Sequence, residues 1–275
     1  MCRDKNLFNV VLFLSCLGLS LTQGDSPAPS STDKTIDFHH SAEVPQNYAL
    51  QFDGINDYLE IPEIAAIRTR ADEPLTLEFW VWIPAYPKKW QKILSKWGAG
   101  GGHDDEFVIS LRSDGTFGFA NTGSTGLDSK ITIPTEQWCH LCCVWDSVNK
   151  NYALYLNGEQ TFCTIKGGRP LQLTGETLRI GTDGHRNQYF KGKIDEIRIW
   201  KKSLTQAQVE FYMDKKIIRE NSDIVGYWSF DEGRGQVVND DSATRNRGRL
   251  GSSPFTDRSD PRWIPSGLAL ELYPQ

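Results

Sequence analysis

Between Leu50 and Trp200, short segments alternate apolar and polar residues, and Gly, Asn, Asp or Pro separate one segment from the next. Because successive side chains of a strand point to opposite faces, this alternation predicts antiparallel strands with one buried face. In LTLEFWVWI (75–83), for example, the leucines, Phe79 and Val81 share one face, whereas Trp80 and Trp82 share the other. No segment resembles a βαβ unit. The pattern therefore predicts an all-β sandwich or barrel.

One segment, SLTQAQVEFYMDKK (203–216), has the pattern of a helix instead. Thr205 and Gln208 have the spacing of a capping box, in which each side chain binds a free backbone amide of the first turn. The apolar residues form a narrow stripe, so the helix is expected to pack on the sandwich rather than cross it. After this helix, VGYWSF (225–230) predicts one more strand.

The chain of 275 residues divides into four segments. Residues 1–24 have the charged start and small-residue end of a signal peptide, and their apolar run of about 15 residues is shorter than the roughly 20 that span a bilayer. Residues 25–45 are rich in Ser, Pro and Asp and predict a flexible leader. We expect one domain over 46–230 and a C-terminal extension over 231–275 that packs on the sandwich as an added edge strand. A truncated tandem repeat is the competing explanation for the extension.

These features predict a secreted, extracellular protein that does not insert into membranes. The formal net charge is −5, and no basic run would neutralise phosphates, which argues against a nucleic-acid partner. Four cysteines follow the predicted signal peptide, and an oxidising compartment allows them to form disulfides. Adjacent Cys142 and Cys143 point to opposite faces of a strand and are not expected to join. The pairing among these two, Cys139 and Cys163 stays open.

The order of the motifs resembles the laminin G-like jelly-roll domain of the concanavalin A-like lectin/glucanase superfamily. The resemblance extends from about residue 47 to about 270 and includes ALQFDGINDYLEIP, LTLEFWVWI, LRSDGTFGF, WCHLCCVWD, ALYLNGEQ and GKIDEIRIWKKSLTQAQV. It implies two curved antiparallel sheets in a jelly-roll sandwich, commonly a calcium ion near the rim, and extracellular recognition of glycans or matrix components. Pentraxins share this fold, and LCCVWDS resembles their cysteine-bearing strand. Their partner cysteine would fall within residues 75–83, which contain none.

The segment FDGIND (52–57) has two interpretations. Gly54 allows a positive φ, and Asp and Asn side chains bind nearby backbone amides, so the segment can be a turn alone. Alternatively, Asp53, Asn56 and Asp57 offer oxygen atoms to a calcium ion, which takes six to eight such ligands. A calcium ion held here would be structural.

Asp195 is the fourth candidate ligand for this ion. Strict alternation places Asp195 on the same face as Ile197 and Ile199, and a carboxylate that faces a core is costly unless it is paired or bound to a metal. Members of the family often bring this segment next to FDGIND, so the resemblance implies that Asp195 could complete the site. A salt bridge or a position at the rim is the alternative.

Two further regions are candidate ligand surfaces. Trp90 and Trp97 flank KKWQKILSKW (88–97), and an exposed indole offers a flat apolar surface on which a sugar ring can stack. Burial in the core is the alternative for both. His103, Asp104 and Asp105 form a polar cluster in the loop that follows, which is either a ligand site or a solvated acidic loop.

No catalytic residues are predicted. Glucanases of this fold need two carboxylates on one face of a strand, whereas Asp195 and Glu196 are adjacent and should point to opposite faces. We therefore expect a binding protein and not an enzyme. The two candidate functions are a lectin-like module that binds glycans or matrix components, and a structural component of an extracellular or mineralised matrix without a specific sugar site.

Overall fold

The computed structural model describes residues 47–62, 73–98, 105–121, 127–163, 175–217 and 221–273. The predicted signal peptide and leader, together with His103 and Asp104, lie outside these ranges. Within them, no helix has the length and apolar character needed to cross a membrane.

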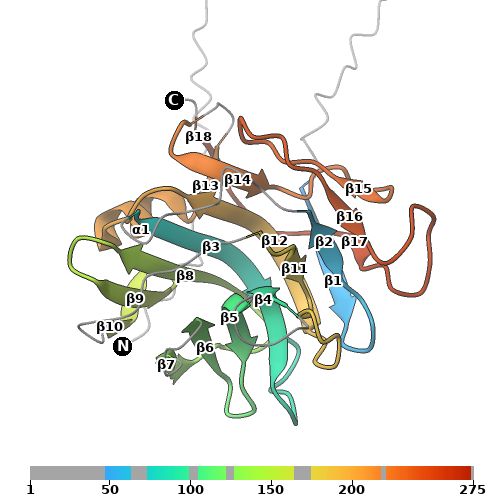
Figure 1. Ribbon diagram of the computed structural model, residues 1–275, viewed down its shortest axis with the longest axis horizontal. Coiled ribbons are helices and arrows are strands. Elements are labelled where there is room, and N and C mark those ends of the chain that lie inside the picture. The colour runs from blue at the N-terminus through green and yellow to red at the C-terminus, as the bar shows by residue number, and fades with distance from the viewer. Residues whose placement is uncertain are drawn as a thin grey trace, which may run out of the picture. The chain divides into compact units, whose positions relative to one another are not determined.

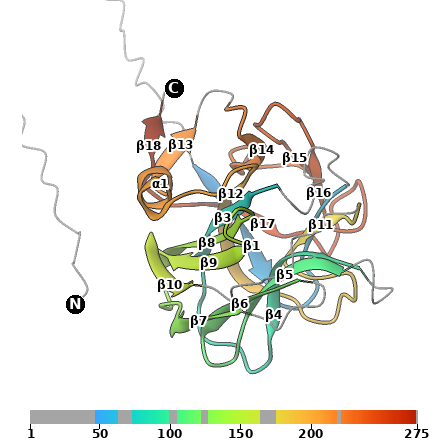
Figure 2. The same cartoon turned by 60° about the vertical axis from the view of Figure 1, so that its left-hand side comes forward.

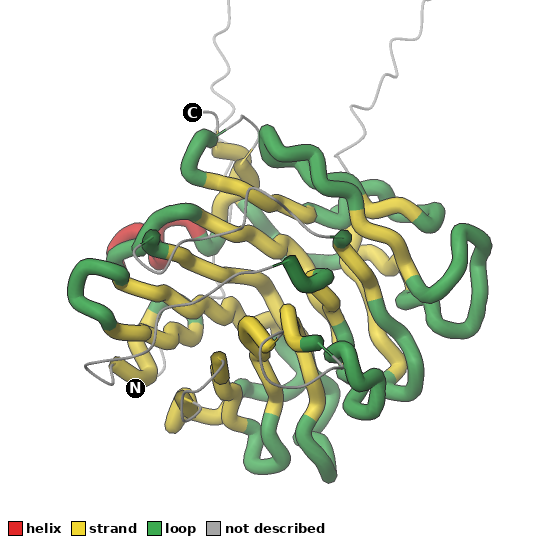
Figure 3. Tube along the Cα trace, in the orientation of Figure 1, coloured by secondary structure: helices red, strands yellow, loops and turns green. Residues whose placement is uncertain are grey.

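Two large antiparallel sheets form a sandwich (Figures 1 and 3). Sheet A contains, in spatial order, β10 (Glu159–Cys163), β9 (Asn151–Leu156), β8 (Trp138–Asp146), β3 (Leu75–Trp82), β12 (Lys191–Trp200), β1 (Tyr48–Asp53) and β17 (Arg262–Pro265), and β14 (Ile224–Trp228) also pairs with β12. Sheet B contains β15 (Val237–Val238), β16 (Gly248–Leu250), β2 (Leu59–Ile61), β11 (Leu178–Ile180), β4 (Gln91–Trp97), β5 (Asp105–Leu111), β6 (Thr116–Asn121) and β7 (Leu127–Thr132). The predicted two-sheet jelly-roll architecture is confirmed.

The core lies between the two sheets and follows the predicted alternation. Phe79 and Val81 of β3 point into it, as do Phe107 and Ile109 of β5. Each large side chain buried in this way stabilises the fold by about 1.5–3 kcal/mol relative to an exposed position. The inner faces of the strands therefore hold the sandwich together, and the outer faces remain available for other contacts.

A short helix, α1 (Gln206–Tyr212), packs over the outer face of sheet A (Figure 2). Its capping box is formed as predicted: the Thr205 hydroxyl accepts from the Gln208 amide at 3.3 Å, and the Gln208 side chain accepts from the Thr205 amide at 3.0 Å. The helix is shorter than the predicted 203–216, because β13 (Lys215–Ile217) pairs with β18 (Glu271–Tyr273) instead of continuing it.

One buried guanidinium connects this layer to sheet A. Arg198, which is 1 % exposed, donates to the Glu196 carboxylate at 2.8 Å and to the carbonyl of Tyr212 at 2.8 Å. A further hydrogen bond reaches the carbonyl of Lys215. Arg198 therefore binds the end of α1 and the start of β13 at once, which fixes their position over the sheet.

Residues 231–273 add strands to both sheets. β17 pairs with β1 at the edge of sheet A, and β16 pairs with β2 in sheet B. The first strand of the domain thereby gains a partner on its outer side, and a strand edge that would otherwise be open to other chains is covered.

Three of the four cysteines are not in a disulfide, in contrast to the expectation from the sequence. Cys139, Cys142 and Cys143 are buried free thiols, so the predicted disulfide does not involve these three, while the side chain of Cys163 lies outside the described residues. Burial raises the pKa of Cys139 to about 11 and moves those of Cys142 and Cys143 upward as well. Cys143 belongs to the core and Cys142 to the cluster beneath α1, which confirms that the two face opposite ways.

Candidate functional site

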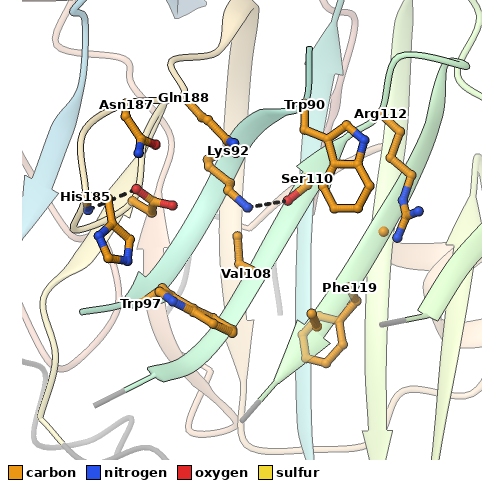
Figure 4. Close-up of a pocket in the computed structure, with 13 residues that line it drawn as sticks. Trp90, Lys92, Trp97, Val108, Ser110, Arg112, Phe119, His185, Asn187 and Gln188 are labelled. Carbon is orange, nitrogen blue, oxygen red and sulfur yellow. Dashed lines mark hydrogen bonds between the residues drawn. The ribbon is translucent and has the colours of Figure 1, made fainter. Parts of the chain in front are cut away.

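A groove of about 350 Å³ lies on the outer face of β4, β5 and β6 in sheet B (Figure 4). Its floor consists of small side chains that sit opposite one another across two strands: Val108 opposite Ala120, and Ser110 opposite Gly118. Because none of these side chains is larger than valine, the sheet surface is depressed at this point. We call this depression the groove.

Two tryptophans line the groove, and both were predicted ligand-binding residues. Trp97 is the last residue of β4, and Trp90 directly precedes the first. Trp90 is 46 % exposed, and Trp97 is partly exposed. The guanidinium of Arg112 lies 4.3 Å from the centre of the Trp90 ring, which holds this indole by a cation–π contact.

The loop over residues 181–190 forms another wall of the groove. The Gly184 amide donates to the Trp97 carbonyl at 2.9 Å, and the Gly181 amide donates to the Ile93 carbonyl at 2.8 Å. These bonds fix the loop against β4, so that its polar side chains line the groove: Asp183, His185, Asn187 and Gln188. None of these four residues was predicted from the sequence, although the polar run TDGHRNQ (182–188) between two strands was a signal for a loop that can carry function.

Lys92 supplies the amino group of the groove. Its Nζ atom lies 3.4 Å from Ser110 Oγ, at the long end of hydrogen-bond distances. Burial lowers the pKa of Lys92; the Asp183 carboxylate acts in the opposite direction, and Arg112 adds to the lowering. In the described part of the chain Lys92 forms no salt bridge. Together the groove offers indole rings, hydrogen-bond donors and acceptors of both kinds, and charges of both signs.

The FDGIND segment forms a tight turn whose carboxylates bind its own backbone. Asp53 Oδ1 accepts from the amides of Ile55 at 2.7 Å and Asn56 at 3.3 Å. Asp57 Oδ2 accepts from the Asp53 amide at 2.8 Å. The interpretation of this segment as a turn alone, closed by its own side chains, accounts for these contacts.

Asp195 does not face the core, because a β-bulge interrupts the alternation of β12. The register with β3 shifts between Asp195 and Arg198, and Glu196 has a positive φ of 53°. Ile194 before the bulge and Ile197 after it both point into the core. Asp195 therefore lies on the outer face, where its Oδ2 and Ser266 Oγ are 2.5 Å apart in a hydrogen bond.

The predicted four-residue calcium centre is not assembled. Asp53 is opposite Lys191 in the pairing of β1 with β12, and Leu50 is opposite Ile194. Asp195 is thus about four residues along the strand from the turn, roughly 13 Å at the rise of a β-strand. Within the described ranges, no group of three or more His, Cys, Asp or Glu side chains is arranged to hold a metal ion. The residues predicted as ligands therefore do not fit a shared ion.

The same bulge overturns the prediction that the neighbouring carboxylates of β12 point to opposite faces. Asp195 and Glu196 both lie on the outer face of sheet A instead of on opposite faces. Both are covered, at 0 % and 1 % exposure, and Glu196 also accepts from the Tyr227 hydroxyl at 2.6 Å. Of the other predicted ligand residues, Asp105 begins β5 but its side chain lies outside the described residues, as do His103 and Asp104.

Comparison with known proteins assigns the chain to a family. A laminin G-type model, described as the Concanavalin A-like lectin/glucanases superfamily, matches residues 53–210. The chain belongs to this superfamily. The family match covers both tryptophans of the groove and the whole loop 181–190, and it agrees with the two-sheet architecture.

Individual members are distant. A pentraxin fusion protein of Xenopus laevis is 26% identical over 107 residues, which are 36% of this chain and 26% of that protein. A protein of Bacteroides ovatus that is described as assigned to carbohydrate binding has a similar structure, with a TM-score of 0.59 and 17% identity over 80% of this chain and 62% of the other. A heptameric pentraxin of Limulus polyphemus aligns with a TM-score of 0.46 and 23% identity over 60% of this chain and 81% of the other. The match to the pentraxin fusion protein spans only about a quarter of that protein's length.

Proposed function

We propose that this chain is a secreted extracellular module that binds glycans in the groove of sheet B and does not catalyse a reaction on them. The observation that carries the proposal is the pair of indoles, Trp90 and Trp97, beside a floor of small side chains. Membership of a superfamily named for lectins, and structural similarity to a protein assigned to carbohydrate binding, support it.

The chemistry of the groove suits a sugar. One face of a pyranose ring carries mainly C–H groups and can pack on an indole, while its hydroxyls need donors and acceptors around the edge. Asn187 and Gln188 supply both, Asp183 accepts, and Lys92 donates. The volume of about 350 Å³ falls within the range of about 300–1,000 Å³ that is typical of small-molecule sites.

A glycan array followed by titration calorimetry tests the proposal. We expect the full secreted chain to bind a subset of glycans, and Trp97→Ala to weaken that binding by about five- to tenfold, because loss of one aromatic contact removes on the order of 1–1.5 kcal/mol. Trp82→Ala is the matched control, since Trp82 is a partly exposed tryptophan on the outer face of sheet A.

Three other outcomes bear on the proposal. Equal loss in both variants would show that the effect is not specific to the groove. Silence across the array would favour the alternative of a structural matrix component. Calcium dependence, which remains a prediction, is tested by the same titrations in chelator; retained affinity there would remove the ion from sugar binding.

A further inference from the structure

The position of Lys92 in the groove points to the class of glycan. Lys92 is opposite Ser110 on β5, and Ser110 is opposite Gly118 on β6, so the three form one row across the groove floor. Figure 4 shows the Lys92 side chain between His185 on one side and Trp90 with Arg112 on the other. The Lys92 amino group therefore lies near the middle of the groove.

The Lys92 amino group forms no ion pair with a carboxylate among the described residues, although the Asp183 charge acts on it from the other wall of the groove. The Lys92 side chain is only partly exposed, and its amino group contacts Ser110 Oγ at 3.4 Å. Removing a charge from water without a partner is costly, and a ligand that supplies the opposite charge recovers that energy on binding.

Arg112 adds a second positive charge on the same side. Arg112 directly follows the last residue of β5, two residues after Ser110, which makes it a diagonal neighbour of Lys92 on the same face, at roughly 7–8 Å between backbones. Its guanidinium is fixed by the Trp90 ring and by an ion pair with Asp128. A Cβ on Gly118 would lie only 3.0 Å from Arg112 Nε, so the glycine leaves the space that the guanidinium uses. Both cations therefore line the strand side of the groove.

The opposite wall sets a limit on the charge of the ligand. Asp183 lines the loop side, where its Oδ1 accepts the His185 amide at 3.0 Å. A carboxylate there accepts hydrogen bonds from hydroxyls and repels a second anionic group. The groove is thus polarised across its width, with cations on the strands and an acceptor-rich wall on the loop.

We propose that the groove selects an acidic saccharide, in which one carboxylated sugar places its carboxylate at the Lys92 amino group, on the side of the groove that Arg112 also lines, and its hydroxyls against the loop 183–188. This inference rests on the proposed function and names its ligand class. The carboxylate forms a charge-assisted hydrogen bond with the Lys92 amino group and relieves the repulsion between the two cations. The groove accommodates one anionic group per sugar, whereas the Asp183 carboxylate repels the additional sulfates of a polysulfated chain.

The test compares each acidic oligosaccharide with its methyl ester, which keeps the ring and hydroxyls but removes the charge. For the full chain at pH 7 we expect the uronate or sialate form to bind at least about tenfold more tightly than its ester, with the difference shrinking as salt is added. Lys92→Gln should abolish this difference, while Lys92→Arg should retain most of it. Lys191→Gln, which removes an exposed lysine from β12 of the other sheet, is the matched control and should leave it unchanged.

The outcomes separate the two proposals. Binding of acid and ester with equal affinity, still lost in Trp97→Ala, overturns the acidic ligand and leaves glycan binding intact. Stronger binding of a polysulfated chain than of the carboxylated sugar also overturns it. Absence of binding to every saccharide overturns the proposed function and this inference together. The comparison of acid with ester in the unmutated chain needs no variant, so a folding defect in Lys92→Gln cannot obscure the result.

Discussion

At the scale of single residues, Asp57 shows how burial changes the chemistry of a side chain. It is 4 % exposed, and burial, together with the charges of Asp53 and Asp260, raises its pKa from 3.8 to about 6. The folded chain therefore holds this proton more tightly than the unfolded chain does. Ionisation of the buried Asp57 carboxyl group lowers the stability of the fold. This loss is absent below about pH 4, grows as the pH rises towards about 6, and is complete above that pH.

Asp57→Asn should remove this pH dependence. The asparagine Oδ1 can still accept the Asp53 amide, so the turn is kept while the charge is lost. In urea denaturation with chelator at pH 4, 5, 6 and 7, we expect the stability of the variant relative to the original chain to rise between about pH 4 and 6 and to level off above that. Asp53→Asn removes one of the charges that raise the Asp57 pKa and should move the transition to lower pH. A difference that stays flat with pH would refute the assignment.

At the scale of elements, local rules succeed where one strand or helix decides its own geometry. The alternation of β3 and the capping box of α1 are both present as the sequence predicts. The alternation fails in β12, where the bulge at Glu196 turns Asp195 outward. A bulge depends on how two strands pair and on what covers them, and a single strand carries no periodic signal for it.

The helix cap gives a direct test at this scale. Thr205→Ala removes the side-chain acceptor for the Gln208 amide and should lower the free energy of unfolding by about 1 kcal/mol. Gln206→Ala is the matched control, because Gln206 lies on the same helix and its exposed side chain donates to the exposed Glu210 carboxylate. Its effect should stay within about 0.5 kcal/mol. Equal losses in both variants, measured by urea denaturation, would contradict the role of the cap.

At the scale of the whole molecule, the two ends of the described domain meet. Tyr48 of β1 pairs with Pro265 of β17, and the Ser266 hydroxyl binds Asp195, 71 positions earlier in the chain. Burial raises the pKa of Asp195 far above its ordinary value, with the neighbouring Glu196 charge acting in the same direction. The segment after residue 230 therefore adds a strand to sheet A and supplies a hydrogen-bond partner to the buried Asp195 side chain.

Ser266→Ala should reveal this dependence. Loss of the hydroxyl leaves the buried Asp195 side chain without that partner, and we expect a loss of about 1–3 kcal/mol in the free energy of unfolding. Ser253→Ala, in an exposed loop of the same segment, is the control and should change stability by less than about 0.5 kcal/mol. If thermal and urea unfolding do not distinguish the two variants, the closure does not depend on this contact.

The sequence by itself determined the features that depend on neighbouring residues: the strand alternation, the capped helix, the FDGIND turn, and Trp90 with Trp97 as candidates for a ligand surface. Only the tertiary structure decided which distant residues meet. Pairing in sheet B brings Lys92, Arg112 and the loop 183–188 together beside the two indoles, and the register of β12 with β1 keeps Asp195 away from the turn. Alternation records which face of a strand is buried, but the choice of partner strand and its register follows from packing energies summed over the whole sandwich.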